Sequence, residues 1–151
     1  MEGFQVVASP DVVGVLRQEH ERIQQLCLDV RKAGQGSKER PLALLQEAVH
    51  LHLLGEIAVA HPAVRNSGPA GDTVAVACQV EGEQLERALN DLEVSNPDFD
   101  ASFEALSGAL LDHASAQQRD EFPLLRRYVT TQRLHMMAGA MRDARIMAAT
   151  D

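Results

Sequence analysis

Two short patterns in the sequence combine residue types that bind metal ions. The first is His52-Leu-Leu-Gly-Glu56, and the second is His113-Ala-Ser-Ala-Gln117. Residues four apart lie about 40° apart around a helix, so their side chains leave one face at successive turns. The imidazole and carboxylate of the first pattern are therefore placed as two ligands of one ion would be.

The two patterns belong to an internal repeat. His52 and His113 are 61 positions apart, and the proline ten residues after each of them recurs at the same offset. His20 falls opposite Gly82 at an offset of 62. A lone His-x-x-x-Glu pair is more often a surface hydrogen bond. Because several landmarks recur together, each half is interpreted as one helical hairpin with a shared role.

Five segments must position these residues, and their apolar residues recur at the three- and four-residue spacing of helices. Asp11 can cap the first helix, and Pro41 suits the first turn of the second. Turn-rich residues 66–72 are expected to stop the second helix, and residues 95–98 the third. The predicted helices span about residues 11–33, 41–62, 73–93, 99–127 and 132–149.

These elements predict an all-α fold, an up-and-down four-helix bundle made of two repeated helical hairpins with a short C-terminal helix. Only 3% of the residues are aromatic and there is no Trp, which favours helices over sheets. A length of 151 residues fits a single domain over 1–151. The bundle would occupy about residues 11–129, and the last helix about 132–149.

Charge and hydropathy exclude several classes of function. The net charge of -8 and the scattered 14 Lys and Arg side chains argue against nucleic-acid binding. No run approaches about 18 uninterrupted apolar residues, so no membrane span is expected. Residues 1–10 lack the order of a signal peptide, and Cys27 and Cys78 form no disulfide framework. We therefore expect a cytoplasmic protein whose cysteines are buried thiols.

The sequence resembles the hemerythrin-like family, also called the HHE cation-binding domain, over about residues 16–149. That family has a His on its first helix and His-x-x-x-Glu on its second, and then the same again. Residues 19–23, Glu-His-Glu-Arg-Ile, resemble the first-helix motif and place His20 at its histidine. His52 and Glu56 fill the second-helix positions.

The second half departs from the family pattern. His113 is kept, but Gly82 stands at the third-helix histidine position and Gln117 at the fourth-helix carboxylate position, beside the equally neutral Gln118. Glu86 lies four residues after Gly82 and so shares its face, where some family members have a further ligand. An amide oxygen is a weaker ligand than a carboxylate because it carries no charge.

The resemblance implies iron as the cofactor, one or two ions, with manganese as the other metal that suits these ligands. The ligands that it implies are His20, His52, Glu56, Glu86, His113 and Gln117.

Three functions are compatible with these residues. The first is a non-haem iron protein, expected to be di-iron, that binds or activates a small molecule such as O2, NO or peroxide. The second is an oxidative enzyme that acts on an organic substrate with the same metal site. The third is a metal-free helical interaction module. If the protein is an enzyme, a non-haem iron oxidoreductase is expected.

The other histidines are expected to lie outside the site. His61 follows His52 by nine residues, which is about 180° around a regular helix, so it is interpreted as a core or partly exposed residue. His50 lies about 200° from His52 and is expected to face solvent. His135 belongs to the C-terminal helix.

Overall fold

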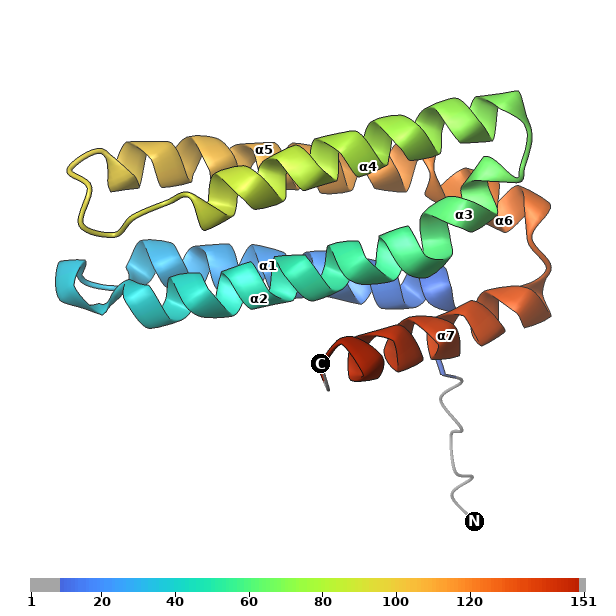
Figure 1. The fold of residues 1–151 in the computed structure, drawn as a ribbon, viewed down its shortest axis with the longest axis horizontal. Helices are drawn as coiled ribbons and strands as arrows, with labels where there is room; N and C mark the ends of the chain where they lie inside the picture. The colour runs from blue at the N-terminus through green and yellow to red at the C-terminus, as the bar shows by residue number, and fades with distance from the viewer. Residues whose placement is uncertain (1–8, 150–151) are drawn as a thin grey trace, which may run out of the picture.

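The computed structural model describes residues 9–149, and the chain is helical over nearly all of this range. The long helices are α1 (Val12–Lys32), α2 (Glu39–Gly55), α4 (Pro69–Asn90) and α5 (Phe99–Asp120). In Figure 1, α1 and α2 form one antiparallel hairpin, and α4 and α5 form another beside it. The predicted all-α, up-and-down bundle is confirmed. Residues 1–8 and 150–151 of the predicted domain lie outside the described part.

Local signals explain most helix ends. The carboxylate of Asp11 accepts a hydrogen bond from the backbone N–H of Gly14 at 2.9 Å, so the predicted cap of α1 is confirmed. A 3-10 turn, η1 (Gln35–Ser37), then joins α1 to α2. α4 begins at Pro69, before the predicted residue 73, because the turn takes only residues 66–68 and ends at Gly68, whose φ is 112°.

Two helices change direction at their prolines. α2 continues through a π-helical turn, η2 (Glu56–Ala60), into α3 (His61–Arg65). α5 is interrupted at Glu121 and continues as α6 (Phe122–Tyr128). A proline has no N–H, and its ring clashes with the carbonyl four residues earlier. The predicted helices 41–62 and 99–127 are therefore each divided near Pro62 and Pro123.

The C-terminal helix α7 (Thr131–Ala149) agrees with the predicted 132–149 and packs across α1, α2 and η2 (Figure 1). Gly55 lets it approach closely, because a Cβ atom there would lie 2.6 Å from Cε of Met141. The side chain of Arg145 donates a hydrogen bond to the carbonyl of Leu51 at 3.2 Å and pairs with Glu19. These contacts attach α7 to the middle of the bundle.

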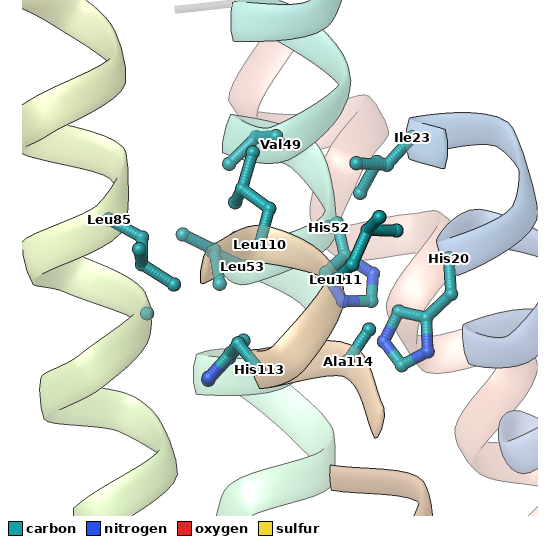
Figure 2. A pocket seen from close by; sticks show the side chains of 11 residues that line it. His20, Ile23, Val49, His52, Leu53, Leu85, Leu110, Leu111, His113 and Ala114 are labelled. Atoms are coloured by element: carbon teal, nitrogen blue, oxygen red, sulfur yellow. The ribbon is translucent and has the colours of Figure 1, made fainter. Parts of the chain in front are cut away.

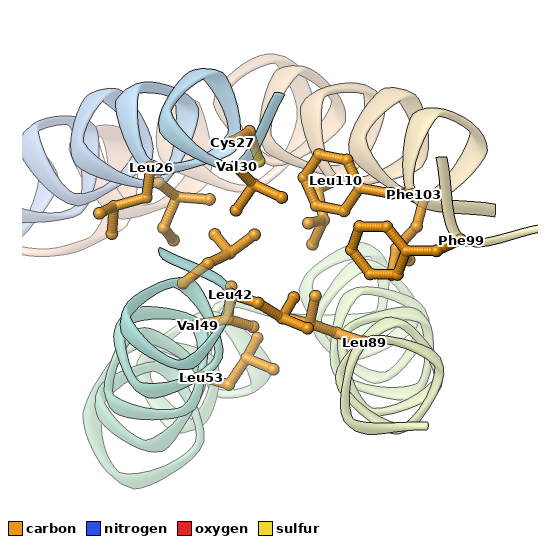
Figure 3. Close-up of a cluster of buried hydrophobic side chains, with 13 residues drawn as sticks. Leu26, Cys27, Val30, Leu42, Val49, Leu53, Leu89, Phe99, Phe103 and Leu110 are labelled. Carbon is orange, nitrogen blue, oxygen red and sulfur yellow. The ribbon is translucent and has the colours of Figure 1, made fainter. Parts of the chain in front are cut away.

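The core consists of two apolar clusters that follow one another along the bundle. The first, shown in Figure 3, gathers residues 23–30 of α1, 42–53 of α2 and 99–110 of α5 around Leu89. The second gathers residues 12–16 of α1 with the inner sides of α3, α6 and α7. A layer of buried polar side chains lies between the two clusters. It consists of His20, His52, Glu56, His113 and Gln117. This polar layer is the candidate functional site.

One continuous helical stretch, Glu39–Arg65, is long and apolar enough to cross a membrane by length and composition. In the structure this stretch is α2, η2 and α3, and it packs against α1, α4 and α7. It also contains the buried carboxylate Glu56. A core helix of a bundle has the same properties.

Candidate metal centre

Five of the six predicted ligands meet in the polar layer. α1 supplies His20, the junction of α2 and η2 supplies His52 and Glu56, and α5 supplies His113 and Gln117. Each of them is at most 8% exposed to solvent. Ligand atoms of His20, His52 and Glu56 lie within 4.8 Å of one another, so these three residues could hold a metal ion.

The sixth predicted ligand, Glu86, is not brought to this cluster. Its carboxylate pairs with Nδ1 of His50 at 2.6 Å, and the His50 side chain is 60% exposed. The inner face of α4 carries Gly82 and Leu85 at this level, and both line the cavity between the helices. Glu86 follows Gly82 by four residues and was predicted to share its face, but the remaining rotation of about 40° turns Glu86 towards His50 at the edge of α2. The expectation that His50 faces solvent is confirmed.

Three histidines of the site share one arrangement, in which a carboxylate holds the outer ring nitrogen, Nδ1. A carboxylate only accepts hydrogen bonds, so Nδ1–H is the donor in each pair. Such partners fix the tautomer and orientation of metal-binding histidines. The pairs are His52 with Glu19 at 2.8 Å, His113 with Glu81 at 2.7 Å and His61 with Glu121 at 2.6 Å.

The inner nitrogens of the same histidines are buried and make no hydrogen bond among the described residues. Both carboxylate oxygens of Glu56 are in the same condition. Nε2 of His52 lies 2.5 Å from Oε1 of Glu56, and Nε2 of His61 lies 3.2 Å from Oε2, although neither contact has hydrogen-bond geometry. If only Nδ1 carries a proton, the ring is neutral and the lone pair of its Nε2 faces a carboxylate oxygen. The two groups then repel each other. A cation, either a proton or a metal ion, must therefore lie on each side of Glu56.

The π turn brings His61 into this group. Because Pro62 has no N–H and its ring crowds the carbonyl of Ala58, the helix widens, and His61 N–H bonds to the carbonyl of Glu56. His61 then lies one π turn after Glu56. The prediction that His61 is buried is confirmed at 1% exposure, but its placement opposite the site was wrong because it assumed a regular α-helix. The proline was the signal that could have found it.

Burial and charge act against each other on the titratable groups. Burial lowers the pKa of His52, but Glu56 and Glu19 outweigh it and raise the value to about 9. Burial likewise lowers the pKa of His61, and the nearby carboxylates of Glu121 and Glu56 raise it to about 9. Burial raises the pKa of Glu56, yet the charge of His52 brings it well below its usual range. Without a metal ion, the centre is therefore an ion-paired cluster at neutral pH.

His20 has a different environment. Burial, together with the charge of His52, lowers its pKa to about 4. The amide of Gln118 lies 3.1 Å from Nδ1 of His20, and Oε1 of Gln117 lies 2.9 Å from its Nε2. Gln117 also donates to Glu121 at 3.4 Å. A glutamine at 117 can accept one hydrogen bond and donate another, which an ionised carboxylate cannot do.

A small apolar cavity adjoins the centre, with a volume of about 30 Å³. In Figure 2 the rings of His20, His52 and His113 border this cavity, and apolar side chains, mostly leucines, form the rest of its lining. A Cβ atom added to Gly82 would lie 2.9 Å from Cδ2 of Leu53 and 3.5 Å from Nε2 of His113. The glycine at the third-helix position therefore leaves open space directly beside Nε2 of His113, one of the predicted ligand atoms.

Comparisons with known proteins identify the fold. The chain matches no family model and no curated protein. Among solved structures, it is similar to a hemerythrin HHE cation binding domain-containing protein from Mycobacterium kansasii. The two chains share 23% sequence identity with a TM-score of 0.76, over 94% of this chain and 91% of that chain. The chain therefore has the hemerythrin-like fold.

Proposed function

We propose that this chain binds iron in the polar layer and presents it to a small molecule such as O2, NO or peroxide. The observation that carries the proposal is a set of buried nitrogen and oxygen atoms that make no hydrogen bond within residues 9–149, on His52, His61, His113 and Glu56. Burying such groups costs several kcal/mol unless each meets a proton or a metal ion.

The chemistry of the donors suits iron. Imidazole nitrogens and carboxylate oxygens are the ligands of iron and manganese sites in helix bundles. A bound iron ion supplies an electron source and a Lewis acid. The side chains of His20, His52, His113 and Glu56 would bind the ion. The negative charge of Glu56 would offset the positive charge of the metal. Glu19 and Glu81 would orient the rings of His52 and His113.

The cavity beside Gly82 supports a diatomic or similarly small ligand over an organic substrate. At about 30 Å³ it has room for one or two molecules of the size of water, and apolar side chains form most of its surface. Leu53, Leu85 and Leu110 are among the apolar side chains that line it. A substrate with several carbon atoms would require the helices to separate.

Metal content tests the proposal directly. Protein purified from iron-supplemented cells is expected to contain iron in at least equimolar amount. The His52→Ala variant should lose it by more than about tenfold, since even an outer partner of a ligand contributes 10-fold to 100-fold to affinity. His135→Ala, a matched change at an exposed histidine, should keep the iron of the unchanged protein. Elemental analysis beside an optical spectrum in air gives the result.

A metal-free module is the second candidate, and one observation favours it. Glu56 lies between His52 and His61, so two imidazolium rings can balance the carboxylate with protons alone. Protein that contains neither iron nor manganese after supplementation, yet still unfolds cooperatively, would exclude the first function and favour this one.

Gly82→Ala is expected to slow NO binding to the ferrous protein by about tenfold, a change worth about 1.4 kcal/mol. The added methyl group would occupy the space between Leu53 and His113, where its nearest neighbour lies at 2.9 Å. The iron content should not change, because Gly82 supplies no ligand. Stopped-flow absorption would give the association rate.

Gly108→Ala is the matched control for this change. Gly108 lies on α5, and no atom of the described residues comes within 4 Å of an added Cβ, so alanine there changes only the helix propensity, by about 1 kcal/mol. Its NO binding rate should equal that of the unchanged protein. Equal rates in both variants would place the small-molecule ligand elsewhere.

A further inference from the structure

His61 is 1% exposed, and its Nε2 faces Oε2 of Glu56 at 3.2 Å. We propose that His61 binds a second metal ion together with Glu56, on the Oε2 side of the carboxylate, while His20 and His52 serve the ion on the Oε1 side. This inference rests on the proposed function and extends it by one ligand and one ion position.

The two sides of Glu56 are built alike. On the Oε1 side, Nε2 of His52 faces the carboxylate and Glu19 holds its Nδ1. On the Oε2 side, Nε2 of His61 faces the carboxylate and Glu121 holds its Nδ1. A carboxylate that faces an imidazole on each oxygen is the arrangement of a bridging ligand between two ions.

The path of the chain also indicates a role for this ring. The equivalent proline of the second half, Pro123, is accommodated by a break in the helix at Glu121. At Pro62 the helix instead makes a π turn, and this turn aligns His61 with Glu56. π turns occur frequently at functional sites because they redirect a side chain within a helix.

The partner of His61 is itself buried and well held. Glu121 has no exposed surface, and it accepts hydrogen bonds from Nδ1 of His61 at 2.6 Å and from Gln117 at 3.4 Å. A histidine needed only for packing would not require a second buried carboxylate. Glu121 instead gives the ring the tautomer in which Nε2 can bind a metal ion. We assign Glu121 as a positioning residue.

The alternative is that His61 remains protonated and serves as a fixed positive charge beside Glu56. The two states differ in metal stoichiometry. The test is anaerobic titration of the metal-free full-length protein with Fe²⁺, followed by desalting and elemental analysis, with binding measured by calorimetry. The unchanged protein is expected to bind two ions per chain, and His61→Gln to retain one with little change in its affinity.

Two further variants keep the test decisive. The Glu121→Gln variant should fold and keep His61. Its affinity for the second ion should fall by about 10-fold to 100-fold. This variant also serves if His61→Gln fails to fold. His135→Gln, at an exposed histidine, should bind two ions like the unchanged protein.

The possible failures are distinguishable. If the unchanged protein binds iron but His61→Gln keeps the same number of ions and the same affinities, His61 is not a ligand and the proposed function stands. A single ion in the unchanged protein, retained by both His61→Gln and Glu121→Gln, also overturns the inference alone. If the unchanged protein binds no metal, the proposed function and the inference both fail.

Discussion

Replacing Glu56 with alanine is expected to lower the free energy of unfolding of the metal-free protein by about 3–5 kcal/mol, the usual effect of removing one partner of a buried ion pair. Glu56 has no exposed surface and lies within 3.2 Å of both His52 and His61. Without it, two imidazolium rings would face each other's charge in a site that water does not reach. Urea unfolding of chelator-treated protein at neutral pH would measure the change.

Glu86→Ala is the matched control, because it removes the same side chain from an ion pair with a histidine at the surface. The His50 partner is 60% exposed, so the pair is screened by water and its loss should cost at most about 1 kcal/mol. Glu86→Ala should also leave metal binding unchanged, whereas Glu56→Ala should abolish it. If the two variants lost equal stability, Glu56 would not balance a buried charge.

The bundle could be predicted from the sequence because its signals are local and repeated. Apolar spacing, the cap at Asp11 and the short loops determine where helices form, and the repeat of about 61 residues determines which helices pair. The start of α4 was predicted too late, since a single glycine with a φ of 112° completes a turn for which the composition suggested seven residues. Helix ends depend on such single conformations, and composition does not reveal them.

The site was predictable where it follows regular helix geometry. His20, His52, Glu56, His113 and Gln117 meet because each pair within a helix obeys the α-helical period and the repeat sets the level at which the helices cross.

Three residues could not be placed by the helical period, two because the chain is irregular near them and one because of how its helix packs. The period of 3.6 residues placed His61 about 180° from His52, but Pro62 converts one turn into a π turn and changes that angle. Glu121 lies at the break between α5 and α6, where no period applies, and its contact with His61 joins residues 60 positions apart. Glu86 had the right spacing from Gly82, but which α4 side chains face inward depends on how that helix packs.

The stability of the metal-free protein is expected to fall as the pH rises from about 6.5 to 9. The pKa of His52 and that of His61 are both raised to about 9 from the ordinary 6.5. A group with a raised pKa in the folded state stabilises the protein fully below its unfolded value, and this contribution is lost as the pH rises through its folded value. A pKa shift of this size corresponds to about 3 kcal/mol in the free energy of unfolding. The contributions of His52 and His61 do not add, because both depend on Glu56.

At acidic pH the stability of the metal-free protein is expected to fall as the pH decreases. The pKa of Glu56 is lowered well below 4.5, so its contribution is present above that value and is lost as the pH falls through the depressed one. His20, with a pKa lowered to about 4, also favours unfolding below pH 6.5, because the unfolded chain binds its proton first. Urea unfolding at a series of pH values should therefore show a maximum near pH 6 to 7 for the metal-free protein.

Metal binding should depend on pH in the reverse direction over the same range. A metal ion must displace the protons of the imidazolium rings of His52 and His61, so its affinity should rise from pH 6.5 to 9 and its binding should release protons. Protein saturated with metal should accordingly keep its stability where the metal-free form loses it. Unfolding curves of the two forms that stay parallel from pH 6.5 to 9 would contradict both the charged cluster and its exchange for a metal ion. Curves that diverge would show that proton and metal compete for the same nitrogens.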